Sequence, residues 1–258
     1  MIAGSAGSVT FPTGAPPASA ASVTDLLAVS GLGKSIGRRR VLDGVTFSVR
    51  PGEVLGLVGP KGAGKTTLLG CLAGLLPTQA GRVTDGMGKD LSPAVRRKLL
   101  FYLPDGILPW PEQSLDRLLG LWSHLWRVPE AREEALVERL ELWRFRDLKA
   151  GSLSKGERER MLLALGLMSP RPLLLLDEPF DGLDLGQARE VAKLLKEAAA
   201  EGRTLLLSLH EMGDAGRVCD RIVILDRGRV AGVENIDHLR ERPGFARGSL
   251  NEGVLAPT

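Results

Sequence analysis

One segment of the sequence constrains the fold of this chain more than any other. Gly59–Thr66 reads Gly-Pro-Lys-Gly-Ala-Gly-Lys-Thr and matches the pattern G-x-x-x-x-G-K-[S/T]. A phosphate group needs a concave set of backbone N–H donors, and Gly62 and Gly64 leave space for its approach. Residues 53–59 before the motif predict a buried strand, and residues 65–75 predict a helix. This order predicts an α/β fold with a phosphate site.

Two side chains of the motif add chemistry to the backbone cradle. Lys65 supplies a fixed positive charge for the terminal phosphates of a nucleotide, and Thr66 supplies a hydroxyl for Mg²⁺. The helix that follows directs its N-terminal N–H groups and its dipole at the same anion. A plain glycine-rich turn is the alternative interpretation, and the flanking strand and helix argue against it.

A second motif ends a short apolar run. Residues 173–179 read Leu-Leu-Leu-Leu-Asp-Glu-Pro, as expected for a buried parallel strand that stops at two carboxylates. Asp177 is placed to hold Mg²⁺, because α/β sheets collect ligands at the carboxyl ends of their strands. Glu178 is a candidate to orient or deprotonate an attacking water. The alternative interpretation is a solvated acidic turn, and the presence of a phosphate-binding loop in the same chain argues against it.

A third motif opens a predicted helix over residues 154–168. Ser154 and Glu157 have the S-x-x-E spacing of a capping box. A capped helix start and an anion site are compatible, since both use N–H groups that have no partner within the helix. The motif by itself does not separate the two interpretations.

Strands and helices alternate along the chain on both sides of a mostly helical middle part, which predicts an α/β core with a helical insertion. All four tryptophans lie in this middle part and indicate a small core of its own. Residues 1–22 predict a disordered leader, whereas residues 80–98 and 233–258 show no clear pattern. The further predicted strands are 41–49, 204–209, 221–225 and 229–232, and the further predicted helices are 114–126, 129–143 and 187–201.

Composition argues against several classes of protein. The 258 residues are 43% hydrophobic with a net charge of +3, unlike an acidic disordered chain or a strongly basic nucleic-acid binder. No segment approaches the roughly 18 apolar residues of a membrane span, and the N-terminus lacks a signal-peptide pattern. Cys71 and Cys219 are too few for a disulfide framework, and both are expected to be buried thiols in a reducing compartment.

Three further segments accompany these motifs: Tyr102–Asp105, Phe180–Asp184, and His210 after the strand 204–209. The ordered set resembles that of the ATP-binding cassette (ABC) ATPases over about residues 25–232. The resemblance implies an α/β P-loop NTPase fold with a mixed sheet, an N-terminal antiparallel β part and a helical subdomain insertion. The corresponding motifs are Walker A (Gly59–Thr67), the Q-loop (Tyr102–Asp105), the signature (Leu153–Glu157), Walker B (Leu173–Glu178), the D-loop (Phe180–Asp184) and the switch histidine (His210).

The resemblance also implies a domain plan and a set of site residues. Residues 23–258 would form one domain, with a RecA-like core (about 23–100 and 168–232), a helical subdomain (about 105–167) and a tail (233–258). ATP and Mg²⁺ would be the cofactors, enclosed between two cassettes paired head to tail. The implied catalytic residues are Lys65, Glu178 and His210, and the implied metal ligands are Thr66, Asp105 and Asp177. The implied ATP-binding residues are Ile36, Gly59, Pro60, Lys61, Gly62, Ala63, Gly64, Lys65, Thr66, Thr67, Asp105, Ser154, Gly156 and Asp184.

Several positions depart from the family pattern. Ile36 stands where an aromatic residue commonly stacks on adenine, which predicts weaker ATP binding, and Asp105 replaces the usual Q-loop Gln. Lys155 replaces the first signature glycine, and the resulting Ser-Lys-Gly form resembles a branch of cassettes that drive exporters. Lys61 and Glu157 stand where Asn and Gln are common.

We therefore expect an ATP-hydrolysing subunit of an ABC transporter, with export favoured as the direction. It would act as a homodimeric or heterodimeric pair of cassettes on the cytoplasmic face of the membrane, bound to a separately encoded permease. Two alternatives stay open: a soluble ABC ATPase that acts on nucleic acid or ribosomes, and a weakly hydrolysing half of an asymmetric heterodimer. The small net charge argues against a nucleic-acid partner. Arg38–Arg40 is expected to be a solvated turn, and residues 115–126 are expected to pack mainly in the core.

Overall fold

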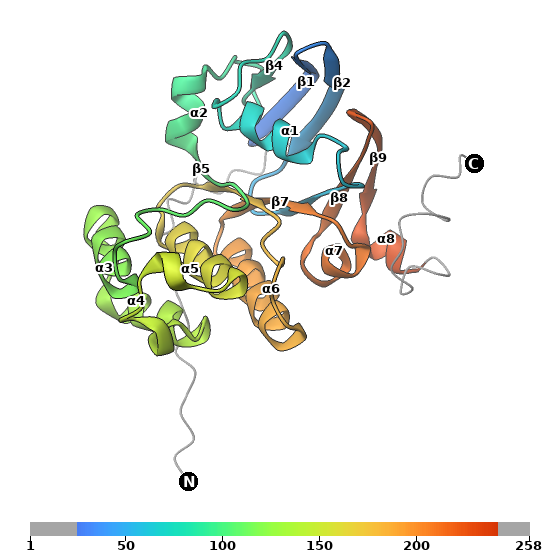
Figure 1. Ribbon diagram of the computed structural model, residues 1–258. Coiled ribbons are helices and arrows are strands. Elements are labelled where there is room, and N and C mark those ends of the chain that lie inside the picture. Colours follow the sequence, from blue (N-terminus) through green and yellow to red (C-terminus); the bar gives the residue numbers. More distant parts are fainter. Residues whose placement is uncertain (1–24, 242–258) are drawn as a thin grey trace.

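Two sheets and the helices around them make up the described part of the chain, which is residues 25–241 of a computed structural model. The predicted leader (1–22) and residues 242–258 of the predicted tail lie outside it. Figure 1 shows the smaller sheet at the top, the larger sheet across the middle, and most of the helices below. This mixed α/β architecture confirms the predicted fold class.

The smaller sheet is antiparallel and consists of β1 (Leu27–Ile36), β2 (Arg39–Val49) and β4 (Ala80–Thr84), in the order β2-β1-β4. The sequence predicts β2 but assigns neither β1 nor β4. In β1 the pairing shifts register after Val29, and Gly31 has a φ of 62°. Such irregularities interrupt the two-residue alternation by which a half-buried strand is recognised.

The larger sheet has the strand order β5-β6-β7-β3-β8-β9 and is parallel except for the pair β8–β9. Burial along the whole length of β3, β6 and β7 explains their continuous apolar runs. β6 ends at Asp177, and the adjacent strands β3 and β7 are followed directly by Gly59 and His210, so the predicted motifs meet at one edge of the sheet. The bounds are β3 (Val54–Val58), β5 (Leu100–Leu103), β6 (Leu173–Asp177), β7 (Thr204–Leu209), β8 (Arg221–Asp226) and β9 (Arg229–Asn235).

Apolar side chains of the larger sheet alternate between its two faces. On β7, Leu205 and Leu207 belong to one hydrophobic cluster and Leu206 belongs to another. The first face is covered by three helices: α5 (Lys155–Met168), α6 (Leu185–Ala200) and α7 (Met212–Val218). The second face is covered by α1 (Lys65–Leu72) and the smaller sheet (Figure 1). Both cysteines are buried free thiols within these clusters, as expected.

The helical middle part comprises α3 (Leu115–Trp126), α4 (Glu130–Arg139), the short 3-10 helices η1 (Leu142–Phe145) and η2 (Ala150–Ser152), and α5. A single helix over 129–143 is wrong, because Glu141 has a φ of 53° and separates α4 from η1. Trp122 and Trp126 stack with ring centroids 5.9 Å apart, whereas Trp143 is 56% exposed. The tryptophans therefore do not share one core.

Two arginines of low exposure, one of them buried, fix this helical part to the rest of the molecule. The guanidinium of Arg139 in α4 lies 2.5 Å from carboxylate oxygens of Glu190 and of Glu197, both in α6. Arg132 donates to the carbonyl of Leu167 near the end of α5, at 2.5 Å. Charge-assisted hydrogen bonds of low exposure hold such elements together more firmly than surface ion pairs.

Three short elements occur where the sequence patterns assign nothing. These are α2 (Pro93–Leu99), β5, and α8 (Ile236–Arg240), which follows β9. Side chains at Ser92 and Asn235 cap the two helices. Across residues 25–241, no helix combines the length and apolar character needed to cross a bilayer.

Candidate functional site

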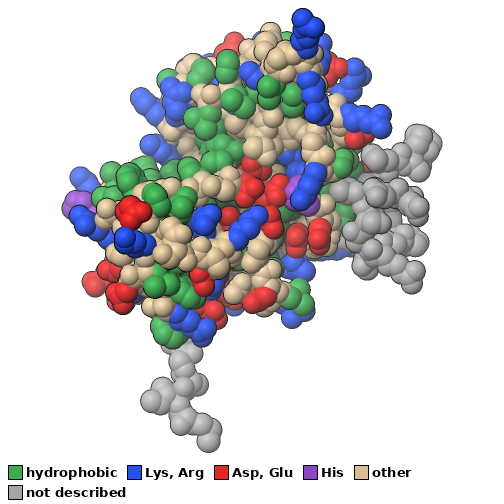
Figure 2. All heavy atoms as spheres, in the orientation of Figure 1, with side chains coloured by type: hydrophobic (Ala, Val, Ile, Leu, Met, Phe, Trp, Pro, Cys, Tyr) green, Lys and Arg blue, Asp and Glu red, His purple; other side chains and the backbone are tan. Residues whose placement is uncertain are grey.

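A cavity of about 540 Å³ lies beside the loop between β3 and α1. Figure 2 shows acidic side chains gathered in the middle of one face of the molecule, with a histidine and basic side chains next to them. Arg39, Val41, Lys155 and Asp181 line the cavity although the sequence does not predict them as site residues. The predicted site residues that it brings together are Ile36, Lys61, Gly62, Gly64, Lys65, Thr66, Thr67, Asp105, Glu178 and His210.

The glycines of the loop are required by its backbone. Gly62 and Gly64 have φ values of 83° and 106°, in the left-handed region that favours glycine. A Cβ at Gly64 would lie 3.0 Å from the carbonyl of Val41, and one at Gly59 would lie 2.1 Å from the carbonyl of Leu225. A Cβ at Gly62 would meet no atom within 4 Å, so this glycine keeps space open at the cavity wall.

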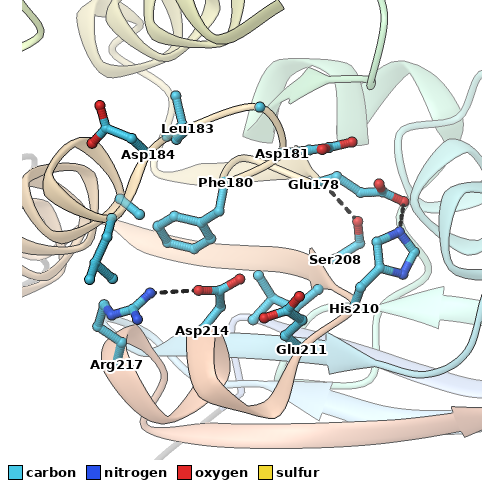
Figure 3. Close-up of a pocket in the computed structure, with 14 residues that line it drawn as sticks. Glu178, Phe180, Asp181, Leu183, Asp184, Ser208, His210, Glu211, Asp214 and Arg217 are labelled. Atoms are coloured by element: carbon cyan, nitrogen blue, oxygen red, sulfur yellow. Dashed lines mark hydrogen bonds and ion pairs between the residues drawn. The ribbon is translucent and has the colours of Figure 1, made fainter. Parts of the chain in front are cut away.

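Glu178 adopts an unusual backbone conformation directly after β6. Its φ is 55°, a region that costs a non-glycine residue on the order of 1–3 kcal/mol. The Glu178 N–H donates to the Ser208 hydroxyl at 3.0 Å, and this contact from β7 holds the turn in place (Figure 3). Its carboxylate Oε1 lies 2.5 Å from His210 Nε2. The bend therefore points this carboxylate toward the cavity and the histidine.

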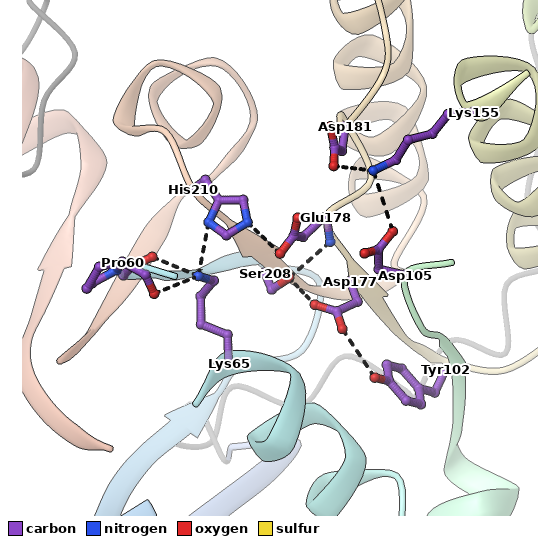
Figure 4. Close-up of polar contacts among 11 residues, drawn as sticks. Pro60, Lys65, Tyr102, Asp105, Lys155, Asp177, Glu178, Asp181, Ser208 and His210 are labelled. Atoms are coloured by element: carbon purple, nitrogen blue, oxygen red, sulfur yellow. Dashed lines mark hydrogen bonds and ion pairs between the residues drawn. The ribbon is translucent and has the colours of Figure 1, made fainter. Parts of the chain in front are cut away.

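Lys65 and His210 are in direct contact beside Glu178. The Lys65 ammonium donates to the carbonyls of Gly59 (2.7 Å) and Pro60 (3.3 Å) and lies 3.2 Å from His210 Nδ1 (Figure 4). Lys65 is only 5% exposed, and burial lowers the pKa of its ammonium, while nearby Glu178 and Asp177 raise it.

The contact with Lys65 indicates which ring nitrogen of His210 accepts a hydrogen bond. The ammonium of Lys65 can only donate, so His210 Nδ1 must accept. The other ring nitrogen, Nε2, lies 2.5 Å from Oε1 of Glu178 and is the nitrogen left to carry a proton. The histidine thus connects the P-loop lysine to the candidate catalytic carboxylate.

Asp177 lies behind the cavity and not in its wall. Its carboxylate accepts a short hydrogen bond from the Ser208 hydroxyl and a longer one, 3.4 Å, from the Tyr102 hydroxyl. Burial and Asp177 both raise the pKa of Tyr102, which keeps this phenol protonated and able to donate. Ser208 is a site residue that the sequence analysis missed; its signal is a hydroxyl inside an otherwise apolar strand.

Lys155 and Asp105 meet in a charged cluster at the rim of the cavity. The Lys155 ammonium forms a short ion pair with Asp181 and lies 4.0 Å from Asp105. The hydrogen bond from Lys155 lowers the pKa of Asp181 and the same contact raises the pKa of Lys155. The signature residue that departs from the family pattern therefore pairs with the D-loop and approaches the Q-loop of its own chain.

Glu159 lies next to this cluster, one helical turn beyond Lys155. Burial, followed by the charge of Asp105, raises the pKa of Glu159 to about 7. Because its folded-state pKa lies above the ordinary value, this group lowers stability as pH rises toward 7, where the charged form must be buried. The sequence gives no signal for this behaviour, which depends on the packing of α5.

Ser154, Gly156 and Asp184 do not line the 540 Å³ cavity. Ser154 and Glu157 form the predicted capping box of α5, and Asp184 forms a second capping box with Gln187 at the start of α6. Asp184 borders a separate cavity of about 380 Å³, which shares Glu178, Asp181 and His210 with the first (Figure 3).

Gly156→Ala is expected to separate the start of α5 from the D-loop. A Cβ at Gly156 would lie 2.4 Å from the carbonyl O of Gly182, so one of the two backbones must move. Such overpacking lowers the free energy of unfolding by about 1–3 kcal/mol, measurable by urea denaturation. Gly120→Ala in α3 is the matched control, since a Cβ there meets nothing within 4 Å. Equal losses in the two variants would contradict this close approach.

The residues present fit a magnesium nucleotide. The cradle at Gly62 has room that a side chain would occupy, and Lys65 and the N-terminus of α1 supply positive charge beside it. Oxygen donors suited to Mg²⁺ are the Thr66 hydroxyl in the cavity wall and the Asp177 carboxylate behind it. Gly62, Lys65 and Thr66 belong to the first motif of the sequence, and Asp177 belongs to the second.

Comparisons with known proteins point to the same family. Residues 42–181 match the family described as ABC transporter. The hemin import ATP-binding protein HmuV of Streptomyces coelicolor is 39% identical over 248 residues, 92% of this chain and 86% of that protein. The lipopolysaccharide export system ATP-binding protein LptB of Acidithiobacillus ferridurans is 36% identical over 217 residues, 81% and 89% of the two chains.

A solved structure titled as the ATP binding subunit of an ABC transporter is 31% identical, with a TM-score of 0.74. The alignment covers 88% of this chain and 97% of that one, so the likeness extends well beyond the phosphate loop. The sequence match over more than half of the chain and the shared architecture agree. The chain therefore belongs to the ABC transporter family, as one of its ATP-binding, ATP-hydrolysing subunits.

Proposed function

We propose that this subunit hydrolyses ATP in the 540 Å³ cavity and drives export through a separate membrane permease. The observation that carries the hydrolytic site is the continuous set of contacts from Lys65 through His210 to Glu178. A cation, an imidazole and a carboxylate in contact along one cavity, beside a phosphate cradle, support this role. Positioning and charge stabilisation are what phosphoryl transfer requires of a protein.

Each residue then has a role in the reaction. Thr66 and Asp177 would hold Mg²⁺, with Asp105 nearby, and the ion would supply positive charge to the phosphates. Lys65 binds the terminal phosphates in place of the carbonyls of Gly59 and Pro60. Glu178 accepts the proton of the attacking water. His210 Nε2 lies 2.5 Å from Glu178 Oε1 and limits the position of this carboxylate at the cavity wall.

A pair of cassettes is part of the proposal. Ser154, Gly156 and Asp184 lie outside the cavity of their own chain, which supports their action on a nucleotide bound by a second cassette. If the second cassette is a copy of this chain, the two ATP sites of the pair are identical; if it is a different chain, they differ. The intact set of Lys65, Asp177, Glu178 and His210 supports hydrolysis here and not a purely nucleotide-binding half.

Export is supported by the Ser-Lys-Gly signature and the acidic residue Asp105. The LptB relative is named for an export system. Import is the second candidate, because HmuV, which shares 39% identity over nearly the whole chain, is named for hemin import. The relatives thus include proteins named for import and for export. A measurement of transport is needed to distinguish the two directions.

The direction can be tested without knowledge of the substrate. Cells producing the wild-type chain with its permease are compared with cells producing Glu178→Gln, and small molecules are profiled inside the cells and in the medium. Export predicts a compound that accumulates inside the variant cells. A compound that instead remains in the medium of the variant culture would reverse the direction. Recovery of the chain with ribosomes or DNA, and not with membranes, would contradict transport.

A further inference from the structure

Lys155 lines the ATP cavity, and the proposed reaction gives it no role. It is the first residue of α5, in the helical middle part of the chain. Its ammonium forms a short ion pair with Asp181, which follows Glu178 by three residues, and lies 4.0 Å from Asp105 (Figure 4). One cation from the helical part therefore meets carboxylates from two loops of the core.

Asp181 belongs to the turn that carries the candidate catalytic carboxylate. The N–H of Asp181 donates to the carbonyl of Glu178 at 3.0 Å, which closes the turn from residue 178 to residue 181. At the beginning of this turn, the N–H of Glu178 donates to the Ser208 hydroxyl, also at 3.0 Å. The φ of 55° at Glu178 is a conformation that persists only where the surrounding structure holds it. The turn is thus held by β7 at its beginning and by Lys155 at its end.

The start of α5 also lies against the backbone that follows Asp181. A Cβ at Gly182 would lie 3.1 Å from Cγ of Lys155, and one at Gly156 would lie 2.4 Å from the carbonyl oxygen of Gly182. The ion pair therefore joins two segments that are already in close contact.

The pair itself is accessible to solvent. The Lys155 side chain is 50% exposed and that of Asp181 is 44% exposed. An ion pair of this exposure adds little to the free energy of unfolding. Removal of the pair is therefore expected to leave the chain folded, so that its effect on the turn can be measured.

We propose that Lys155 is a positioning residue for ATP hydrolysis, which acts through Asp181 to hold the Glu178 carboxylate in the cavity of its own chain. The inference rests on the proposed role of Glu178 as the base. A displacement of a catalytic group by about 1 Å can lower turnover about 100-fold, so a loosened turn has a measurable effect. The ion pair would also connect the signature segment to the catalytic carboxylate within one chain.

Two other roles for Lys155 predict different results. If its ammonium bound the phosphates in its own cavity, its removal would weaken ATP binding. If it acted only on a nucleotide held by a second cassette, its effect on turnover would not depend on Asp181. A positioning role predicts a lower kcat, an unchanged dissociation constant for ATP, and an effect that requires Asp181.

The test is a double-mutant cycle on the full chain, in which phosphate release gives kcat and calorimetric titration with Mg²⁺ and ATP gives the dissociation constant. Lys155→Ala is expected to lower kcat about fivefold, the fold-change that corresponds to the strongest exposed ion pairs, and to leave the dissociation constant unchanged. Asp181→Asn should cause a similar loss, and the double variant should lose no more than either single variant. Lys155→Arg keeps the positive charge and should retain most of the turnover.

Lys149→Ala is the matched control. Lys149 lies between η1 and η2 and forms an ion pair with Glu112 at 2.8 Å, but neither residue lines the cavity. Loss of this second exposed pair should leave both kcat and the dissociation constant unchanged.

Three results would overturn the proposal. Unchanged kcat in Lys155→Ala would mean that the turn does not need the ion pair. Additive losses in the double variant would mean that Lys155 acts independently of Asp181, and weaker ATP binding in Lys155→Ala would mean that it contacts the nucleotide. Failure of the underlying mechanism is seen separately with Glu178→Gln: if that variant hydrolyses ATP as fast as the wild type, Glu178 is not the base.

Discussion

Glu178→Gln is expected to abolish steady-state ATP hydrolysis while the chain still binds ATP. Glutamine has nearly the same shape and can still face His210 Nε2–H through its carbonyl, but it cannot accept a proton from water. Loss of a general base lowers turnover by about 10²–10⁴-fold. Phosphate release measures turnover, and calorimetric titration with Mg²⁺ and ATP measures binding.

The same variant should stabilise an ATP-bound pair of cassettes, because the nucleotide that holds the pair together is no longer consumed. Sedimentation velocity with and without ATP detects the pair. Glu134→Gln is the matched control, since it removes the same charge from an exposed position of α4. Unchanged turnover in Glu178→Gln would remove Glu178 from the proposed mechanism.

Lys65→Ala is expected to show the second large effect, on nucleotide binding. The Lys65 ammonium donates to two loop carbonyls and stands at the phosphate cradle, so its removal takes away the buried cation of the site. Hydrogen bonds to charged groups are worth about 1.5–3 kcal/mol, which corresponds to a loss of roughly 10- to 100-fold in ATP affinity.

Lys193→Ala provides the matched control, because Lys193 is exposed on α6 and remote from the loop. Circular dichroism and the midpoint of urea unfolding confirm that the Lys65 variant is folded. If the folded Lys65→Ala chain bound ATP as tightly as the wild type, the phosphate site would lie elsewhere.

The sequence predicts β3, β6 and β7 of the larger sheet well, because these fully buried strands appear as continuous apolar runs. Runs such as Leu173–Leu176 and Thr204–Leu209 are apolar on both faces, and each is followed by a residue with distinct chemistry. Since parallel strands expose their carboxyl ends at one edge, the meeting of Gly59, Asp177 and His210 follows from the order of elements.

The elements that the sequence does not predict show no such sequence pattern. β1 is interrupted by glycines and register shifts, and β5 follows α2 without a turn residue between them. α8 has only five residues, too few for a helical period to be recognised.

Within the site, sequence spacing identifies residues but not their partners. The Ser208–Asp177 bond joins neighbouring strands, and the Lys155–Asp181 ion pair joins α5 to the D-loop. Both depend on the packing of segments that are 26 or more residues apart. Lys155 illustrates the point, because its departure from the family pattern is visible in the sequence while its carboxylate partner is not.

β3, the strand that leads into the phosphate loop, pairs with β7 and β8 and with no strand closer to it along the chain. During translation, Val54–Val58 is therefore synthesised long before residues 204–226, which supply its sheet neighbours. A nascent chain that already carries the whole loop has no sheet to support it and no His210 to contact Lys65. The ATP site thus matures late in synthesis, and a ribosome-bound chain that stops before Thr204 contains the motif without the site.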